Sequence, residues 1–349
     1  MDKVLTVVIP TYNMERYLRY CLDSLCVSRG GEALEVLVVN DGSKDTSSAI
    51  AHEYEQKHPG IFRVIDKENG NYGSCVNRGL AEAKGKYIKV LDADDSFDTE
   101  NFECFIDFLC NTDADLVVSD FAVVDEGRNI KKVVCHVFPG GCIPMDEICT
   151  AENFSHIQMH AVTYRRDNLL KLSYKQTEGI SYTDQEWVFT PMVGVKQVCY
   201  FDKCVYMYLV GREGQTMNPA VKAKRIPHVC KCVYSMLSAY MQYRNNISEQ
   251  LRTYFYGRLD YMIREVYVSY LQHYSTQNKK LLLQFDSTLK NISLEVYNRL
   301  ESGNSKFNYI HLWRNNIDFN PALVRLAGWC CFRILIPVKN FCLFSFKRK

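Results

Sequence analysis

The chain has 349 residues, of which 47% are hydrophobic and 23% are charged. This is the composition of an ordinary globular protein, long enough for one large hydrophobic core or two smaller ones. The net charge of +2 is too small to indicate a nucleic-acid-binding protein.

The first 120 residues alternate between strand and helix patterns. Short apolar runs that end at turn residues predict strands, and apolar residues spaced along one face predict helices. The predicted strands are residues 5–9, 35–39, 62–65, 87–91 and 116–120. The predicted helices are residues 14–25, 47–58, 74–83 and 99–110. This alternation indicates an α/β fold with a mostly parallel sheet flanked by helices.

The rest of the chain is less regular. The predicted elements are an irregular or hairpin-like segment at residues 121–150, a strand at 160–164, a helix at 185–192 and a pair of tyrosine-rich strands at 198–210. From Arg225 onward the apolar spacing is mostly helical. This change of periodicity places a domain boundary after residue 222, between residues 1–222 and a mainly helical region, residues 223–349.

The fifteen cysteines are scattered, with neither a Cys-x-x-Cys pair nor a Cys/His group at zinc spacing. Residues 1–3 lead directly into an apolar run, so no secretory signal peptide is expected. We therefore expect reduced, mostly buried thiols rather than structural disulfides, and a cytoplasmic protein.

Polar side chains follow three of the predicted strands. Thr11, Tyr12 and Asn13 follow the first strand, Asp41 follows the second, and residues 92–95 (Asp-Ala-Asp-Asp) follow the fourth. Ligands of such sheets bind outside the carboxyl ends of the strands. The sequence therefore predicts a binding site at this edge.

Asp92 and Asp94 stand at positions i and i+2 after a strand, so their carboxylates point the same way and repel each other. A divalent cation with oxygen ligands, Mg²⁺ or Mn²⁺, relieves this repulsion, and a diphosphate can complete its coordination. The alternative is an acidic turn that caps the following helix, a task for which Asp98 and Thr99 are suited.

Three segments resemble, in order and spacing, the N-terminal signatures of glycosyltransferase family 2. They are VVIPTYN at residues 7–13, VVNDGSKDT at 38–46 and GKYIKVLDADD at 85–95. The resemblance covers residues 1–215, the extent of a GT-A domain. It implies an inverting glycosyltransferase that uses a divalent metal and a nucleotide diphosphate sugar, with a UDP-sugar as the expected donor.

The resemblance also implies roles for individual residues. Tyr12 would stack on the nucleotide base, and Asp41 would accept a hydrogen bond from a ring N–H of that base. Asp92 would lie near the ribose and the metal, and Asp94 would be the direct metal ligand. The implied donor-binding residues are Pro10, Thr11, Tyr12, Asn13, Asp41, Asp92 and Ala93. From turn chemistry alone, Asp41 would instead form an Asx turn with Gly42.

A second site is implied by SYTDQEWVF at residues 181–189, which resembles the acidic pair that precedes a short helix in this family. Thr183 replaces the first acid, and Asp184 matches the second, which implies that Asp184 is the catalytic base. The alternative is that Asp184 only caps the helix. Glu186 is a second candidate base, although it points about 200° away around a helix.

Two arginine positions complete the resemblance. Arg212 lies between two glycines in VGREGQT, residues 210–216, where the family has a loop that closes over the diphosphate. Arg212 would neutralise charge on the departing nucleotide, and the alternative is a solvated arginine of a surface hairpin. Many family members carry an arginine where this chain has Val76. Arg78 does not take over that role, because one residue turns a helical side chain by about 100°.

The implied reaction is a single displacement in which Asp184 takes the proton of an acceptor hydroxyl and the anomeric centre inverts. Two other classes stay open. A metal-dependent nucleotidyltransferase would carry a glycine-rich basic loop after its first strand, which this chain lacks. An inactive nucleotide-binding module is the other, since a fold does not establish activity. No Gly-x-Gly-x-x-Gly follows the first strand, which disfavours a dinucleotide-binding oxidoreductase.

The acceptor is expected to be a glycan or a lipid-linked sugar, contacted by residues 121–180 and the helical C-terminal region. His160 is predicted to be a buried structural histidine rather than an acceptor contact. Residues 322–336 are apolar and would form a helix of about 22 Å, shorter than the hydrocarbon core of about 30 Å. With the basic residues 347–349, this tail is predicted to bind the inner face of the plasma membrane without crossing it. The alternative is that it packs on its own domain.

Overall fold

The computed structural model describes residues 2–138, 141–212, 215, 221, 224–273, 275–301 and 309–315. Contacts divide the chain into two compact units. The first contains Met1–Thr216 and Gln242–Phe255, and the second contains Met217–Met241 and Tyr256–Lys349. The domain boundary predicted after residue 222 and the predicted membrane-binding tail fall outside the described residues.

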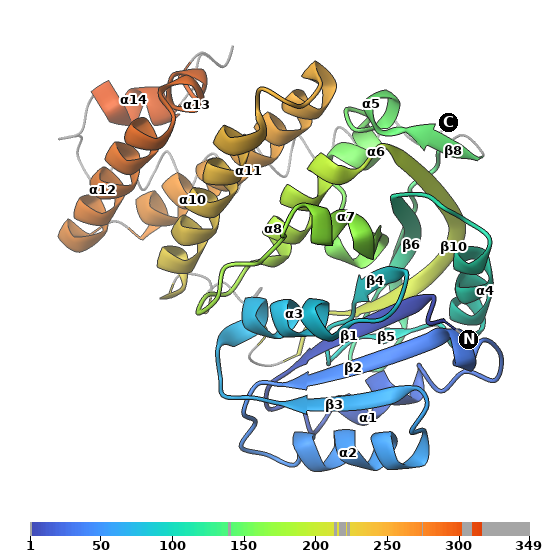
Figure 1. Cartoon of the computed structure of the whole chain (residues 1–349). Helices are drawn as coiled ribbons and strands as arrows, with labels where there is room; N and C mark the ends of the chain where they lie inside the picture. The colour runs from blue at the N-terminus through green and yellow to red at the C-terminus, as the bar shows by residue number, and fades with distance from the viewer. Residues whose placement is uncertain are drawn as a thin grey trace. The chain divides into compact units, whose positions relative to one another are not determined.

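The first unit is built on a mixed sheet (Figure 1). Its strands are β1 (Leu5–Thr11), β2 (Leu34–Asn40), β3 (Phe62–Asp66), β4 (Tyr87–Val90), β5 (Ser96–Phe97), β6 (Leu116–Val124), β7 (Ile130–Val134), β8 (Cys142–Pro144), β9 (Val162–Arg165) and β10 (Gln197–Leu209). The strand order is β3-β2-β1-β4-β9-β6-β10-β5, with β7 beside β6 and β8 beside β10. Strands β1 to β4 pair in parallel, whereas β9 lies antiparallel between β4 and β6. The predicted α/β class is confirmed, and antiparallel strands join the parallel ones in the same sheet.

Helices cover both faces of the parallel strands. They are α1 (Leu18–Asp23), α2 (Ser47–Lys57), α3 (Asn71–Glu82) and α4 (Thr99–Cys110). Figure 1 shows α1 and α2 on one side of β1, β2 and β3, and α3 on the other. Helix α3 packs closely on β1, because a Cβ at Gly79 would lie 2.3 Å from Cγ1 of Val8. The Asp98 side chain accepts a hydrogen bond from the Asn101 N–H and caps α4, as predicted.

The later part of the first unit differs from the sequence prediction at two places. The predicted strand pair at residues 198–210 is instead one strand, β10, which ends at Leu209 and passes Asp202 and Lys203 through register shifts. The helix predicted at residues 185–192 is two short elements, α8 (Asp184–Trp187) and a 3₁₀ helix (Thr190–Gly194). The predicted hairpin within residues 121–150 is present, since β6 and β7 pair antiparallel.

Cys142 and Cys199 form a disulfide, which corrects the expectation of reduced cysteines for this pair. The two residues face each other in the register of β8 and β10, with their Cα atoms 4.4 Å apart. They are 57 residues apart in the chain, so their spacing gave no signal. Other cysteines, such as Cys21 and Cys75, are buried thiols as expected.

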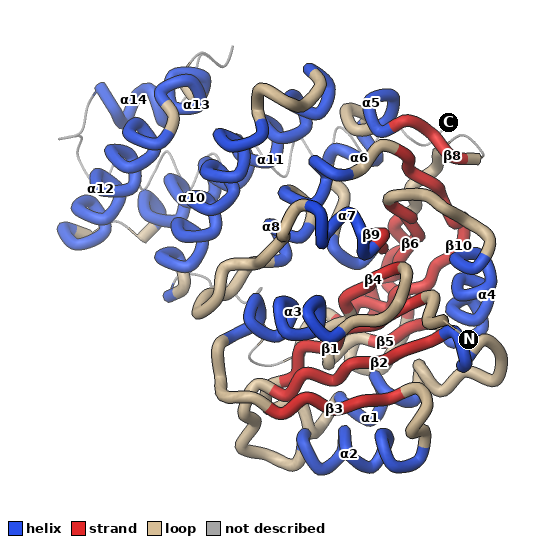
Figure 2. The backbone as a smooth tube through the Cα atoms, in the orientation of Figure 1, coloured by secondary structure: helices blue, strands red, loops and turns tan. Residues whose placement is uncertain are grey.

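The second unit is helical in its described residues (Figure 2). The helices that follow the sheet are α10 (Ile226–Tyr243), α11 (Glu249–Gln272), α12 (Thr276–Ile292), α13 (Leu294–Arg299) and α14 (Tyr309–Asn315). Helix α14 is held to α12 by a buried ion pair in which Nε of Arg314 lies 2.7 Å from Oδ1 of Asp286. Among the described residues, none of the helices is both long enough and apolar enough to span a membrane.

Candidate functional site

The loops that follow β1 and β2 are tied together at the carboxyl edge of the sheet. The Asn13 N–H donates to Oγ of Ser43 (3.0 Å), and the Lys44 N–H donates to Oδ1 of Asn13 (2.7 Å). Asn13 has a φ of 53°, a left-handed conformation that asparagine tolerates. Tyr12 stands beside these contacts with 44% of its surface exposed, which leaves its ring accessible to a flat ligand.

Three other residues predicted to contact the nucleotide sugar are less accessible than Tyr12. Thr11 is buried, and its hydroxyl donates to the Ile9 carbonyl (3.1 Å). Pro10 precedes it within β1. Ala93 is also buried. Their roles toward a donor stay predictions.

Asp41 is a buried carboxylate surrounded by donors of the loop between β3 and α3. Its Oδ1 accepts from Nζ of Lys67 (2.6 Å) and from the Gly70 N–H (2.9 Å), and its Oδ2 accepts from the Asn71 N–H (2.9 Å). These contacts join the end of β2 to the start of α3. The alternative of an Asx turn with Gly42 does not account for these contacts, which Asp41 makes with residues 67–71.

Asp92 lies at the centre of the carboxylate group. The Tyr72 hydroxyl donates to its Oδ1 (2.7 Å). Burial and the charge of Asp94 raise the pKa of Asp92 to about 7, and the charge of Asp184 acts in the same direction. The carboxylates predicted from separate motifs therefore lie close enough to influence one another.

The carboxylate of Asp94 is held by an arginine. Its Oδ2 forms an ion pair with Nε of Arg212, so the structure brings these two predicted residues together. Arg128, in the turn between β6 and β7, donates from Nη2 to the Asp94 carbonyl (3.2 Å), and its guanidinium lies 4.0 Å from the Tyr20 ring centroid. Nη1 of Arg128 is buried without a hydrogen-bond partner among the described atoms. The sequence analysis missed Arg128, because a turn arginine in an irregular segment carries no motif.

Asp95, which was not among the predicted site residues, anchors the loop after β4 to β10. Its Oδ2 accepts from the Tyr206 hydroxyl (2.6 Å) and its Oδ1 from the Leu209 N–H (2.7 Å). The Tyr206 hydroxyl also accepts from the Asp92 N–H (3.1 Å). Burial and the charge of Asp94 raise the pKa of Asp95 well above that of an ordinary aspartate.

Removing the Tyr206 hydroxyl tests this anchor. Tyr206→Phe is expected to lower the free energy of unfolding by about 1–3 kcal/mol, because it leaves a buried Asp95 oxygen without its donor. Urea unfolding followed by circular dichroism measures the change. Tyr20→Phe is the control, because Tyr20 is 47% exposed and phenylalanine keeps the ring under Arg128. Equal stability of the two variants would contradict the proposed anchor.

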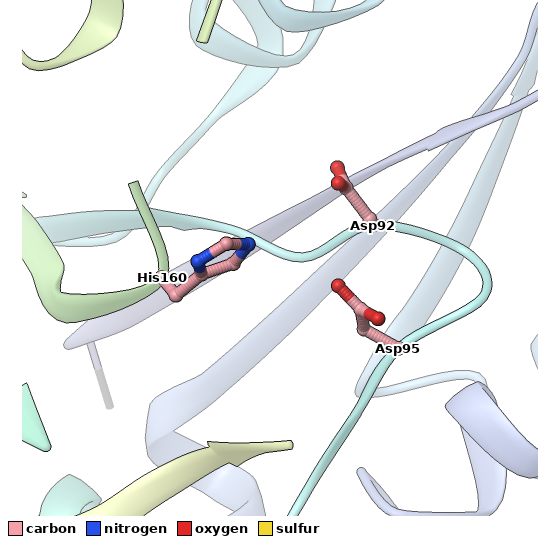
Figure 3. Close-up of side chains that lie close together, drawn as sticks. All are labelled: Asp92, Asp95 and His160. Carbon is pink, nitrogen blue, oxygen red and sulfur yellow. The ribbon is translucent and has the colours of Figure 1, made fainter. Parts of the chain in front are cut away.

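His160 completes a group of possible metal ligands with Asp92 and Asp95. Ligand atoms of the three residues all lie within 4.8 Å of one another, and Figure 3 shows the side chains converging. Burial and the nearby charge of Lys89 lower the pKa of His160 to about 3, so its ring is neutral, as a metal ligand must be. His160 is buried, as predicted, but it lies in the site.

Lys89 supports this arrangement from inside the sheet. It is fully buried in β4, and its Nζ donates to the carbonyls of His160 (2.8 Å) and Val162 (3.3 Å). Burial lowers the pKa of Lys89 to about 7. These bonds tie the backbone of His160 to the strand that leads to Asp92.

Asp184 is the first residue of α8, and Thr183, at the N-cap position, makes no side-chain cap bond. The interpretation of Asp184 as the cap is therefore wrong, and its Oδ2 accepts from Nε2 of Gln185 (2.8 Å). Both carboxylate oxygens of the buried Glu186 accept from Thr177, at 2.7 Å each. Glu186 therefore holds the preceding loop, which disfavours it as the base.

An α/β sheet that gathers carboxylates and arginines at the ends of its parallel strands is the architecture of a GT-A nucleotide-sugar transferase. Residues 6–173, just under half of the chain, match the family described as "Glycosyl transferase family 2". The signature segments that suggested this family lie within the matched range.

The similar proteins include glycosyltransferases and teichoic acid biosynthesis proteins. The chain is 27% identical over 221 residues to the uncharacterized glycosyltransferase YibD of Escherichia coli, covering 58% of this chain and 60% of YibD. It is 38% identical over 104 residues to the minor teichoic acid biosynthesis protein GgaB of Bacillus subtilis, covering 30% of this chain and 12% of GgaB. The chain thus spans 60% or less of the length of these curated relatives.

Solved structures support the same fold. The structure of Staphylococcus aureus TarS 1-349 in complex with UDP-GlcNAc superposes with a TM-score of 0.54 at 19% identity, covering 75% of this chain and 81% of TarS 1-349. The complex of TarS 1-349 with UDP has a TM-score of 0.53 at 18% identity, covering 87% of this chain and 93% of that chain. The predicted GT-A fold is confirmed.

Proposed function

We propose that the protein is an inverting glycosyltransferase that transfers a sugar from a UDP-sugar to a glycan or lipid-linked acceptor in surface polysaccharide synthesis. The observation that carries this proposal is the carboxylate of Asp92 beside the Asp94–Arg212 ion pair. Besides burial and the charge of Asp94, the charge of Asp184 raises the pKa of Asp92, so Asp184 belongs to the same group of charges. The TarS complexes with UDP-GlcNAc and UDP support a uridine donor. The teichoic acid proteins GgaA and GgaB support a surface-polymer acceptor. A lipid-linked acceptor fits the proposed contact of residues 322–336 with the inner membrane face.

The side chains divide into those that act on the acceptor and those that hold the donor. Asp184 takes the proton of the attacking hydroxyl, because a carboxylate beside the site can act as a general base. Arg212, whose Nε pairs with Asp94, neutralises charge on the departing diphosphate. Tyr12 stacks on the base and Asp41 accepts its ring N–H. The proposed contacts along the remaining donor surface are Pro10, Thr11, Asn13 and Ala93.

A divalent cation, Mn²⁺ or Mg²⁺, fits the carboxylate group. Asp92, Asp95 and His160 offer two oxygens and a neutral imidazole nitrogen within 4.8 Å of one another. Burial, and then the charge of Asp94, raise the pKa values of Asp92 and Asp95, and a bound cation would favour the ionised form of both. Asp94, whose Oδ2 pairs with Arg212, can join as a ligand through Oδ1. When bound, the cation stabilises negative charge on the diphosphate leaving group.

The affinity for Mn²⁺ is expected to depend on pH. Mn²⁺ should bind about tenfold more tightly at pH 8 than at pH 6, because Asp92, with a pKa of about 7, must lose its proton to bind the cation. His160 is neutral throughout this range and does not contribute. Isothermal titration calorimetry with Mn²⁺ measures the profile, and Asp92→Asn should weaken the pH dependence to the part that Asp95 contributes. A flat profile for the wild-type protein would remove Asp92 from the cation site.

A panel of nucleotide sugars, incubated with Mn²⁺ or Mg²⁺ and assayed for released nucleoside diphosphate, tests the proposed function. At least one UDP-sugar should release UDP, faster in the presence of a glycan acceptor. Asp184→Asn should abolish the acceptor-dependent part. Release from CDP- or ADP-sugars in preference to UDP-sugars would contradict the proposed donor.

A further inference from the structure

A buried ion pair lies where the ends of β2 and β3 meet. Nζ of Lys67 is 2.6 Å from Oδ1 of Asp41, and the exposed fractions of the two side chains are 19% and 4%. The same ammonium donates to the Glu68 carbonyl (2.5 Å) and to Oγ of Ser74 (2.9 Å). An ammonium has three N–H groups, and here each has an acceptor within the protein. We therefore expect Lys67 to act on a ligand through the carboxylate of Asp41 rather than by a hydrogen bond of its own.

The Asp41 carboxylate is fixed from one side by the same loop. Besides Lys67, it accepts from the N–H groups of Gly70 and Asn71, both at 2.9 Å. The loop is tight at this point, since a Cβ at Gly70 would lie 2.5 Å from Oγ of Ser74. An ionised carboxylate has about four lone-pair sites, so Asp41 can accept one more N–H besides these three.

We propose that Lys67 sets the nucleobase specificity of the donor site by holding Asp41 as an oriented, charge-compensated hydrogen-bond acceptor. Such a carboxylate accepts the ring N–H of uracil or guanine. It repels the ring-nitrogen lone pair that cytosine and adenine present at the corresponding position. Lys67 is thus a residue that positions Asp41. The base that this arrangement selects carries a ring N–H beside a carbonyl. The inference rests on the proposed function, because it needs a nucleotide at Asp41.

The competing explanation is that Lys67 only stabilises the loop before α3. In that case its loss would weaken the binding of every nucleotide to a similar degree, because the loop would be disordered for all of them. If Lys67 sets specificity, its loss changes the ratio of the dissociation constants of two nucleotides that differ only at the edge of the base. The ratio of the dissociation constants of UDP and CDP separates the two explanations.

The experiment measures both dissociation constants by calorimetry in the presence of Mn²⁺, for the wild-type protein and for Lys67→Met. The wild-type protein should bind UDP at least about tenfold more tightly than CDP, the scale of one charge-assisted hydrogen bond. In Lys67→Met the affinity for UDP should fall by about tenfold while that for CDP stays within about twofold, so the ratio narrows. The control is Lys86→Met, which removes a lysine paired with Asp113 (2.8 Å) at the opposite end of β4. Its ratio should equal that of the wild-type protein.

A measurement on the wild-type protein covers the case in which Lys67→Met does not fold. UDP methylated at N3 of the uracil should bind as weakly as CDP, because it has no ring N–H for Asp41. Binding as tight as that of UDP would overturn the inference. So would an equal loss for UDP and CDP in Lys67→Met, and both results would leave the proposed function standing. A wild-type protein that binds neither nucleotide would overturn the inference and the proposed function together.

Discussion

Replacing Asp184 with asparagine is expected to slow sugar transfer by about 10²–10⁴-fold while the dissociation constant for UDP stays within about twofold. The asparagine keeps the size of the side chain and an oxygen for the Gln185 amide, so α8 should keep its place. What is lost is the only proton acceptor that the proposed mechanism assigns to the attacking hydroxyl. Steady-state kinetics with the best donor and acceptor, together with calorimetry for UDP, measure the two effects.

Asp167→Asn is the matched control for this variant. Asp167 lies in the first turn of another short helix, α7 (Arg166–Lys171), and it is exposed. Its replacement should leave the transfer rate unchanged. If Asp184→Asn keeps the wild-type rate as well, the base lies elsewhere. A Glu186→Gln variant would then show whether the carboxylate that now binds Thr177 takes that role.

Asp92→Asn is expected to lower turnover by about 10²–10³-fold and the affinity for Mn²⁺ by at least about tenfold. Asp92 is the carboxylate that both the family resemblance and the observed ligand group place at the cation. The Tyr72 hydroxyl can still donate to the asparagine oxygen, so the fold should be retained. Kinetics and Mn²⁺ titration of the purified variant check this prediction, and wild-type values in both would contradict it.

Asp94→Asn shows which role Asp94 has. The family resemblance implies that Asp94 is a direct metal ligand, whereas the structure holds its carboxylate in an ion pair with Arg212. A loss of Mn²⁺ affinity as large as that of Asp92→Asn would make Asp94 a ligand in the working enzyme. Unchanged affinity with slower turnover would assign it to the positioning of Arg212.

The parts of the fold that follow from local patterns were predicted well. Each of the first four strands is a short apolar run ended by turn residues, and the structure has all four within a few residues of the predicted bounds. Helix α4 occupies the predicted residues, because Asp98 supplies a cap that depends only on nearby atoms. The carboxylates after β4 could also be predicted from the local sequence, because their position depends only on where one strand ends.

The remaining features depend on contacts between distant segments. His160 reaches the carboxylates because β9 enters the sheet antiparallel beside β4, and no local pattern of residues 158–165 specifies that neighbour. Lys89 occupies a position in an apolar strand where a lysine predicts a solvent-facing side chain, yet its ammonium is satisfied by oxygens of the chain around His160. The Cys142–Cys199 disulfide follows from the register of β8 and β10, which the sequence spacing does not contain.

The Asp41–Lys67 ion pair also depends on a contact between segments that are distant in the sequence. The family resemblance implied that Asp41 recognises the base, and that role stays a prediction. Its ion pair could not be predicted, because Lys67 follows a different strand and looks like an ordinary charged loop residue. Strand pairing between β2 and β3 brings the two ends together.

A ³¹P NMR time course of the best nucleotide sugar with Mn²⁺ and a glycan acceptor tests the central claim most directly. The proposed glycosyltransferase should convert the donor to free nucleoside diphosphate, with no pyrophosphate, and Asp184→Asn should lose the acceptor-dependent conversion. Formation of pyrophosphate would make the protein a nucleotidyltransferase. An unchanged spectrum with every donor of the panel would contradict catalytic activity and leave a nucleotide-binding module.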